Sequence, residues 1–296
     1  MDTSTLRNPI WRRADNLRDP AVMRLEDGYV MFYSRFSNRD WGREEDWAVA
    51  AVYTKDFATF ELDRDVTPKG YASPGDPVLW HGRWLLPYQS YPKHPARLFY
   101  SELRGKPGDQ RWSAPQPFLP EANQLPWNTQ RRAIDATFLV DGDVLHCFFV
   151  GSDDRRQPRA NLIGQAVTQD PGLEDWDILT ADEPLIGRSE RAPDGCENVT
   201  VYRTGEVWTL LYSEGMERQH LAYAQSTDLR NWAFKGPLDL EVQTWMAGRY
   251  GAPAVWCDED GYYMILMGLD TDGRATLGLF TSPDGLAWTP LPERTE

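Results

Sequence analysis

The chain contains 296 residues, of which 45 are acidic and 31 are basic, so its formal net charge at pH 7 is −14. This charge argues against nucleic acid or an anionic membrane as a partner, because binding to phosphate groups depends on Lys and Arg. The first residues contain no apolar signal-peptide core, and nowhere do 18 uncharged apolar residues follow one another. We therefore expect no signal peptide, no membrane span and a cytoplasmic location.

The composition favours many short strands over a bundle of helices. Aromatic residues make up 12% of the chain, and there are 23 Gly and 22 Pro. Aromatic residues are frequent in strands, while Gly and Pro are frequent in tight turns. The length is compatible with two average domains or with one large β-domain, so the internal repeats decide the architecture.

In chain order, one pattern occurs five times: a small or acidic residue, an alternating apolar strand, a turn with Gly, and a second strand rich in aromatic residues. The copies begin 54 to 62 residues apart, at Asp19, Asp76, Asp135, Glu197 and Gly251. The turns between the first two strands are expected at Asp27-Gly28, His81-Gly82, Asp141-Gly142, Thr204-Gly205 and Asp260-Gly261.

Each copy continues with a third strand and a closing segment, and four antiparallel strands form one blade of a β-propeller. We predict an all-β fold: a single five-bladed β-propeller over residues 1–296, with four antiparallel strands per blade. The closing segments TKDFATF, TQDPGLEDW, STDLRNW and SPDGLAW share an Asp that precedes an aromatic residue. We expect the Asp to accept backbone N–H bonds in a turn and the aromatic residue to fill the space between blades.

Four of the five first strands begin with an acidic residue. The first strand of a blade is the innermost one, so these acids should meet at one end of the axis, in a pocket walled by the longer loops. Glycoside hydrolysis needs a carboxylic acid that protonates the leaving oxygen and a carboxylate that activates water or attacks carbon. A third acid can help to keep the first one protonated, because like charges disfavour double ionisation. The acids therefore predict a sugar-binding catalytic pocket.

Taken in order, the motifs resemble those of the five-bladed propeller glycosidases, above all glycoside hydrolase family 43, with families 62 and 32 as relatives. The resemblance covers essentially the whole chain. It implies that Asp19, in RDPAVMRLEDGYVMFYS, is the general base and that Asp76, in SPGDPVLWHGRWLLPYQS, is a supporting residue. It further implies that Asp135, in AIDATFLVDGDVLHCFF, orients the general acid and raises its pKa, and that Glu197, in CENVTVYRTGEVWTLLYS, is that acid.

The same resemblance implies an inverting glycoside hydrolase. We expect it to be exo-acting and to remove a terminal pentose, such as α-L-arabinofuranose or β-D-xylose, from an oligosaccharide. Candidate donors to sugar hydroxyl groups are Arg18, Arg132, Asn198 and Arg249. Candidate stacking platforms for the sugar are Trp41, Trp127 and Trp245.

The chain departs from the family 43 pattern at two places. The fourth blade commonly reads EGP in that family, whereas this chain has Cys196-Glu197-Asn198, which is partly closer to family 32. Many members have a His near the axis in the fifth blade, often associated with a metal ion or water, and this chain has Arg249-Tyr250-Gly251 there. Because none of the four His is spaced as a metal pair, we expect no metal ion and no cofactor.

Two alternatives remain open at this stage. The first is a retaining fructan or sucrose enzyme of the family 32 type with Asp19 as nucleophile, although such enzymes usually have a WMNDPNG-like motif and a second β-sandwich domain. The second is a non-catalytic propeller whose acids bind sugar hydroxyl groups. The sequence does not determine the sugar and its linkage, exo or endo action, inversion or retention, the presence of an axial metal ion, or the oligomeric state.

Overall fold

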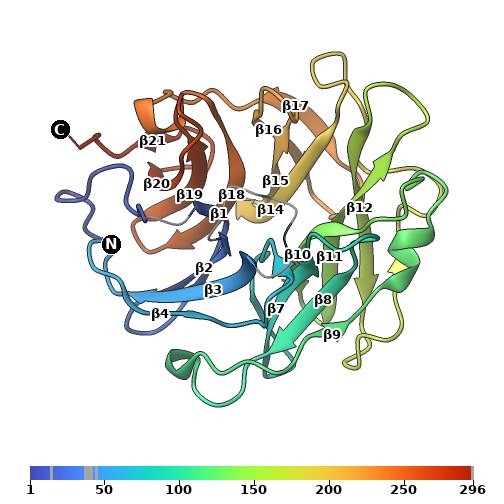
Figure 1. Ribbon diagram of the computed structural model, residues 1–296, viewed down its shortest axis with the longest axis horizontal. Helices are drawn as coiled ribbons and strands as arrows, with labels where there is room; N and C mark the ends of the chain where they lie inside the picture. The colour runs from blue at the N-terminus through green and yellow to red at the C-terminus, as the bar shows by residue number, and fades with distance from the viewer. Residues whose placement is uncertain (14–15, 37–42, 44–45, 295–296) are drawn as a thin grey trace.

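The computed structural model describes residues 1–13, 16–36, 43 and 46–294, so the candidate platform Trp41 lies outside the described residues. Five β-sheets stand around a central axis, and the strands within each sheet are antiparallel (Figure 1). The prediction of a five-bladed β-propeller is confirmed. None of the helices among the described residues is long and apolar enough to cross a membrane.

The first two blades come from the N-terminal third of the chain. Blade 1 consists of β1 (Asn16–Arg24), β2 (Tyr29–Phe36), β3 (Trp47–Thr54) and β4 (Glu61–Asp65). The innermost strand of blade 2 is divided into two short strands, β5 (Tyr71–Ala72) and β6 (Val78–Trp80), which both pair with the next strand. The rest of blade 2 is β7 (Arg83–Ser90), β8 (Leu98–Glu102) and β9 (Gln116–Pro117).

The other three blades have continuous innermost strands. Blade 3 consists of β10 (Ile134–Asp141), β11 (Val144–Asp153), β12 (Ala160–Thr168) and β13 (Asp177–Ile178). Blade 4 consists of β14 (Cys196–Thr204), β15 (Val207–Glu214), β16 (His220–Ser226) and β17 (Ala233–Pro237). Blade 5 consists of β18 (Arg249–Asp258), β19 (Gly261–Leu269), β20 (Ala275–Ser282) and β21 (Thr289–Pro290). The described 3-10 helices are η2 (Pro107–Asp109), η3 (Pro120–Gln124) and η4 (Thr244–Met246).

The turns between the first two strands of each blade lie where the sequence predicts them. In blades 3 and 4 the second turn residue is Gly142 or Gly205, with φ of 60° and 62°. These left-handed values match the tight hairpin turns whose twist suits antiparallel strands, and Gly adopts them without steric cost. Local chemistry therefore sets the pairing of the two inner strands of a blade.

The apolar core lies between neighbouring blades. Between blades 3 and 4, for example, Phe148 and Val150 lie in one cluster with Val201 and Leu210. Such interblade packing buries both faces of a sheet, which is why every residue of the central strand β2 except the half-buried Arg35 is buried.

The closing turns have the predicted chemistry. Their Asp carboxylates each accept backbone N–H bonds from residues a few positions further along, and these residues are Asp56, Asp170, Asp228 and Asp284. The aromatic side chains that follow pack against the interblade clusters, and they are Phe60, Trp176, Trp232 and Trp288.

The innermost strand of every blade contains a β-bulge near its start. At each bulge two residues oppose a single residue of the second strand, and the first of the two has a left-handed backbone, with φ between 49° and 53°. We call this first residue the bulge residue. The five bulge residues are Asp19, Ser73, Asp135, Asn198 and Ala252. Bulges re-aim side chains at the ends of strands, so these five residues point toward the axis as a ring.

The bulge corrects the alignment that we made from the sequence. In blade 2 the position equivalent to Asp19 is Ser73, and Asp76 lies three residues further along. In blade 4 the equivalent position is Asn198, and Glu197 precedes it. In blade 5 it is Ala252, one residue after Gly251. The strand pattern alone does not show which residue is bulged, because the bulge breaks the two-residue alternation.

Hydrogen bonds join the bulges of successive blades. Side chains of second strands accept the backbone N–H of the next blade's bulge residue in three cases. The pairs are Ser34 with Ser73 (2.7 Å), Gln89 with Asp135, and Ser213 with Ala252 (2.8 Å). These bonds hold the ring of bulge residues in a defined geometry.

Candidate active site

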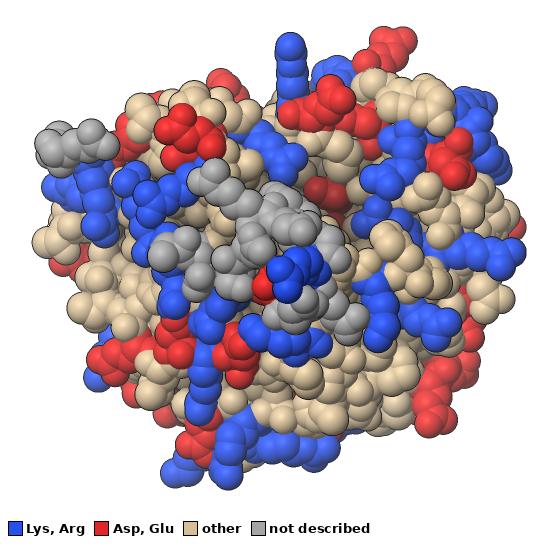
Figure 2. Space-filling view, in the orientation of Figure 1, with Lys and Arg blue, Asp and Glu red and all other residues tan. Residues whose placement is uncertain are grey.

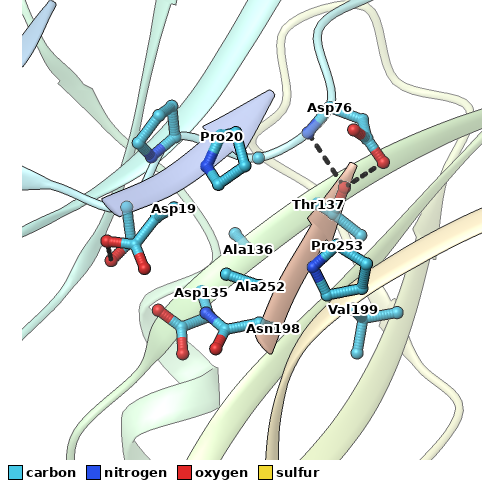
Figure 3. A pocket seen from close by; sticks show the side chains of 13 residues that line it. Asp19, Pro20, Asp76, Asp135, Ala136, Thr137, Asn198, Val199, Ala252 and Pro253 are labelled. Atoms are coloured by element: carbon cyan, nitrogen blue, oxygen red, sulfur yellow. Dashed lines mark hydrogen bonds between the residues drawn. The ribbon is translucent and has the colours of Figure 1, made fainter. Parts of the chain in front are cut away.

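The acids lie at the end of the propeller axis where the innermost strands begin. The axial cavity is lined by the five bulge residues, the residues that follow them, and the inner residues Gly75, Asp76 and Thr137. In Figure 3 the side chains of Asp19, Asp135 and Asn198 lie near one another, whereas the carboxylate of Asp76 points toward Thr137, away from them.

Asp19 is held by two hydroxyl groups. Ser34 Oγ donates to Asp19 Oδ2 at 2.8 Å, and Ser73 Oγ donates to the same oxygen at 3.2 Å. The side chain is 9% exposed. Because both donors bind Oδ2, the carboxylate has a fixed orientation. Among the described residues no side chain donates to Oδ1, so this oxygen can bind a water molecule. This arrangement suits a general base.

Asp135 is the most electrostatically perturbed acid of the pocket. Its residue is 8% exposed, and burial raises the pKa of its carboxyl group well above the usual range. The nearby charges of Glu197 and Asp19 raise this pKa further, whereas Arg132 and a hydrogen bond with Ser73 oppose the rise. Asp135 is therefore close enough to both other acids to interact with each of them.

Two amide groups hold Glu197. Asn161 Nδ2 donates to Oε2 at 2.9 Å, and Gln219 Nε2 donates to Oε1 at 3.0 Å. Asn161 is itself oriented by Ser152, whose Oγ bonds Asn161 Oδ1 at 2.7 Å. Since Asn161 lies on β12 and Gln219 directly precedes β16, blades 3 and 4 together position this carboxyl group.

Asp76 lies deeper along the axis than the ring of bulge residues. Its Oδ2 accepts hydrogen bonds from Thr137 at 3.1 Å and Thr200 at 2.7 Å, which belong to the innermost strands of blades 3 and 4. Burial raises the pKa of Asp76 to about 6, and the two hydroxyl groups partly oppose that rise. Asp76 therefore connects blade 2 to blades 3 and 4, whereas the sequence pattern places it with the acids that begin the innermost strands.

Three of the predicted donors are arginines that surround the acids. Arg18 directly precedes Asp19 on β1, and Arg249 begins β18. The guanidinium of Arg132 interacts with the charges of Asp135 and Glu197. The guanidinium of Arg249 interacts with the charges of Glu197 and Asp19. The fourth predicted donor, Asn198, is the bulge residue of blade 4 and lines the cavity.

The expectation that Trp127 and Trp245 are stacking platforms is wrong for this structure. Each is only 2% exposed. The ring of Trp127 packs over Gly151 and Gly164, and the ring of Trp245 packs over Gly268 and Gly278. Each indole also donates a hydrogen bond, to Thr180 O at 2.7 Å and to Gln243 Oε1 at 2.7 Å. Because glycine has no side chain, the rings of both Trp pack into the core above these glycines.

Several site residues were missed from the sequence. They are Ser34, Ser73, Tyr91, Asn161 and Gln219. Burial raises the pKa of Tyr91, whose hydroxyl group interacts with the charges of Arg18, Asp19, Arg132 and Asp135. Only Tyr91 has a signal in the sequence, because it begins residues 91–96, one of the longer loops expected to wall the pocket. The other four are ordinary polar residues of strands and loops that meet the acids only in the folded ring.

Among the described residues, no three His, Cys, Asp or Glu side chains are placed so that they could hold a metal ion. The carboxyl groups of the site can transfer protons, and its arginines and amides can donate hydrogen bonds.

No protein-family model and no curated protein matches the sequence. Many solved structures are similar to it, however. One is described as a glycoside hydrolase, with 13% sequence identity, coverage of 96% of this chain and 90% of that one, and a TM-score of 0.76.

Two further similar structures carry more specific descriptions. A thermostable family-43 glycoside hydrolase has 14% identity, coverage of 99% and 98%, and a TM-score of 0.72. An α-L-arabinofuranosidase from Lactobacillus brevis has 14% identity, coverage of 100% of both chains, and a TM-score of 0.71. This chain has the five-bladed propeller fold of these glycoside hydrolases.

Proposed function

We propose that the protein is a glycoside hydrolase that removes a terminal pentose from an oligosaccharide with inversion of configuration. One observation carries the proposal: Asp19, Asp135 and Glu197, from the innermost strands of three different blades, lie so close together that Asp135 interacts electrostatically with both other acids. The similar folds of an α-L-arabinofuranosidase and of a xylan β-1,4-xylosidase support a pentose substrate.

In the proposed reaction, Asp19 removes a proton from a water molecule as that water attacks the anomeric carbon. The two serine hydroxyl groups on Oδ2 keep the carboxylate oriented for this step. Glu197 protonates the departing oxygen. Burial and the charges of Glu197 and Asp19 raise the pKa of Asp135, so Asp135 retains a proton more readily than an isolated carboxyl group does. Asp135 thus keeps a proton available beside Glu197.

The proposal is tested with aryl α-L-arabinofuranosides and aryl β-D-xylosides. We expect turnover by the native chain and a fall in kcat of about 100- to 10,000-fold in both Asp19→Asn and Glu197→Gln, since each removes one proton-transfer group. Glu206→Gln is the matched control, because Glu206 is exposed in the turn at the opposite end of the innermost strand that carries Glu197. The control should keep native activity.

Leaving groups separate the two roles. In a 2,4-dinitrophenyl glycoside the leaving group, 2,4-dinitrophenolate, departs without protonation. On this substrate the Glu197→Gln variant should therefore recover much of the lost activity, whereas the Asp19→Asn variant should not. Proton NMR of the first product anomer distinguishes inversion from the retention expected of the family 32 alternative. Sugar binding by the native chain without turnover across the whole panel would instead indicate a non-catalytic propeller.

A further inference from the structure

Two arginines occupy equivalent positions on either side of Glu197. Arg132 lies three residues before the bulge residue Asp135 of blade 3, and Arg249 lies three residues before the bulge residue Ala252 of blade 5. The innermost strand of blade 4, β14, lies between those of blades 3 and 5 around the axis (Figure 1). The propeller symmetry therefore places both guanidinium groups beside Glu197, and both interact with its charge.

Neither arginine is satisfied by the protein. Within the described part of the chain, neither forms an ion pair, and the Arg132 guanidinium has no hydrogen bond. Arg249 has one side-chain hydrogen bond there, from Nη1 to Met216 O at 3.1 Å. The Nε atoms of both are buried without a partner, and burial lowers the pKa of both guanidinium groups. Burying such donors unpaired costs free energy that a ligand can recover.

A shortage of acidic partners does not explain this. The chain has 45 acidic residues for 31 basic ones. Elsewhere arginines pair closely, as Arg24 does with Asp258 at 2.7 Å and Arg35 with Asp65 at 2.8 Å. Figure 2 shows a hollow in this face with an acidic side chain at its floor and Lys and Arg side chains near its edge. Positive charge has thus been placed at the pocket of a strongly acidic protein.

We propose that the pocket binds a sugar that carries a carboxylate, a hexuronic acid, with the carboxylate held between Arg132 and Arg249. A guanidinium group offers two parallel N–H donors that match the two oxygens of a carboxylate, and such charge-assisted pairs are stronger than bonds to neutral hydroxyl groups. The inference rests on the proposed function for one point only: Glu197 marks the glycosidic oxygen, so the uronic acid lies next to the bond that is cleaved. The substrate class is an acidic oligosaccharide.

The first test is a binding measurement that needs no turnover. Isothermal titration of the native chain compares glucuronate with glucose and galacturonate with galactose, because the members of each pair differ only in the carboxylate. We expect at least one acid to bind about tenfold or more tightly than its neutral partner, with the difference shrinking as salt is raised. Equal binding within both pairs would overturn the inference.

The arginine variants locate the effect. Arg132→Leu and Arg249→Leu should each reduce the preference for the acid by about tenfold, while Arg132→Lys should restore only part of it, because ammonium lacks the planar fork. Arg230→Leu, at an exposed arginine of a closing turn, is the control and should keep the preference. Circular dichroism confirms that each variant is folded. A preference that survives in both leucine variants would contradict the assignment.

A second test separates this inference from the proposed function. Pentose release is compared between a uronate-containing oligosaccharide and the same oligosaccharide after chemical reduction of its carboxyl groups. Faster release from the acidic form supports both proposals. Equal release from the two forms overturns the uronate inference and leaves the glycosidase intact. Tight uronate binding without release from either form supports the inference and contradicts the proposed function.

Discussion

Three aspartates of this protein show how neighbours decide what one side chain does. Asp19 faces two serine hydroxyl groups, Asp135 faces two other acids, and Asp76 faces two threonine hydroxyl groups. Only the first two lie in the ring of bulge residues. The chemical roles of these residues thus follow from position relative to the bulge, and not from residue type.

The first residue-scale prediction concerns Asp76. Its folded-state pKa of about 6 lies above the ordinary value of 3.8, so between these pH values the folded protein binds more protons than the unfolded chain. The contribution of Asp76 to stability is therefore present below pH 4 and is lost as the pH rises through 6, by at most about 3 kcal/mol. Asp76→Asn keeps an oxygen for both threonines and does not titrate.

Urea unfolding at pH 4, 5, 6 and 7 measures this effect. The free energy of unfolding of Asp76→Asn, relative to the native chain, should rise between pH 4 and pH 6 and level off towards pH 7. Parallel pH profiles for the two proteins would show that the carboxyl group of Asp76 does not titrate as the structure implies.

The second residue-scale prediction concerns Gln219. Its amide fixes Oε1 of Glu197 without being a proton-transfer group itself. Gln219→Leu should lower kcat on an aryl pentoside by about 10- to 100-fold while KM changes much less, because a misplaced acid slows chemistry more than binding. Gln225→Leu, on strand β16, which Gln219 directly precedes, is the control. Equal losses in both variants would indicate general damage to the strand.

At the scale of the element, the bulge is the device that turns a structural strand into part of a site. An unbroken strand would alternate its side chains between the two faces of the sheet. The bulge puts two residues opposite one and turns the first into the left-handed region, which aims it at the axis in all five blades. The fold supplies five such positions, and acids occupy two of them.

Blades 3 and 5 share a second device, in which a buried Trp covers two glycines of the second and third strands. A Cβ on Gly278 would lie 2.2 Å from a ring carbon of Trp245, so Gly278→Ala should destabilise the protein by about 1–3 kcal/mol. Calorimetry should show a melting temperature several degrees lower. Gly108→Ala is the control, because a Cβ there meets nothing within 4 Å. An unchanged melting temperature for Gly278→Ala would mean that Trp245 moves aside without cost.

At the scale of the whole molecule, the first residues of the chain close the ring. Asn8 and Trp11 bridge to Glu293 and Leu277 of the last blade. The Asn8 side chain is buried, donates to Gln243 Oε1 at 3.0 Å and to Leu279 O at 3.1 Å, and accepts from Leu279 N at 2.8 Å. One side chain thus ties the chain's beginning to its end.

Asn8→Ala should therefore lower the free energy of unfolding by about 3 kcal/mol, since it leaves a buried N–H and a buried carbonyl each short of a bond. Urea unfolding monitored by Trp fluorescence measures the loss. Thr5→Ala, at an exposed residue three positions earlier, should be neutral. A native-like midpoint for Asn8→Ala would show that the ring does not depend on this closure.

The sequence alone determined the fold, because its signals are local: alternating strands, Gly turns and Asp-capped closing turns need no knowledge of distant contacts. It also identified Asp19 and Asp135, which occupy the bulge. Only the tertiary structure decided the rest. Whether Ser73 or Asp76 faces the pocket depends on a one-residue bulge that reverses the direction of side chains.

The same holds for contacts made across blades. Glu197 accepts hydrogen bonds from Asn161 and Gln219, which lie 36 and 22 residues away from it in the chain. The burial of Trp127 and Trp245 depends on glycines of other strands. No local sequence pattern predicts these contacts, because they form only when the ring of blades closes. Side-chain volume then determines which of the residues are exposed.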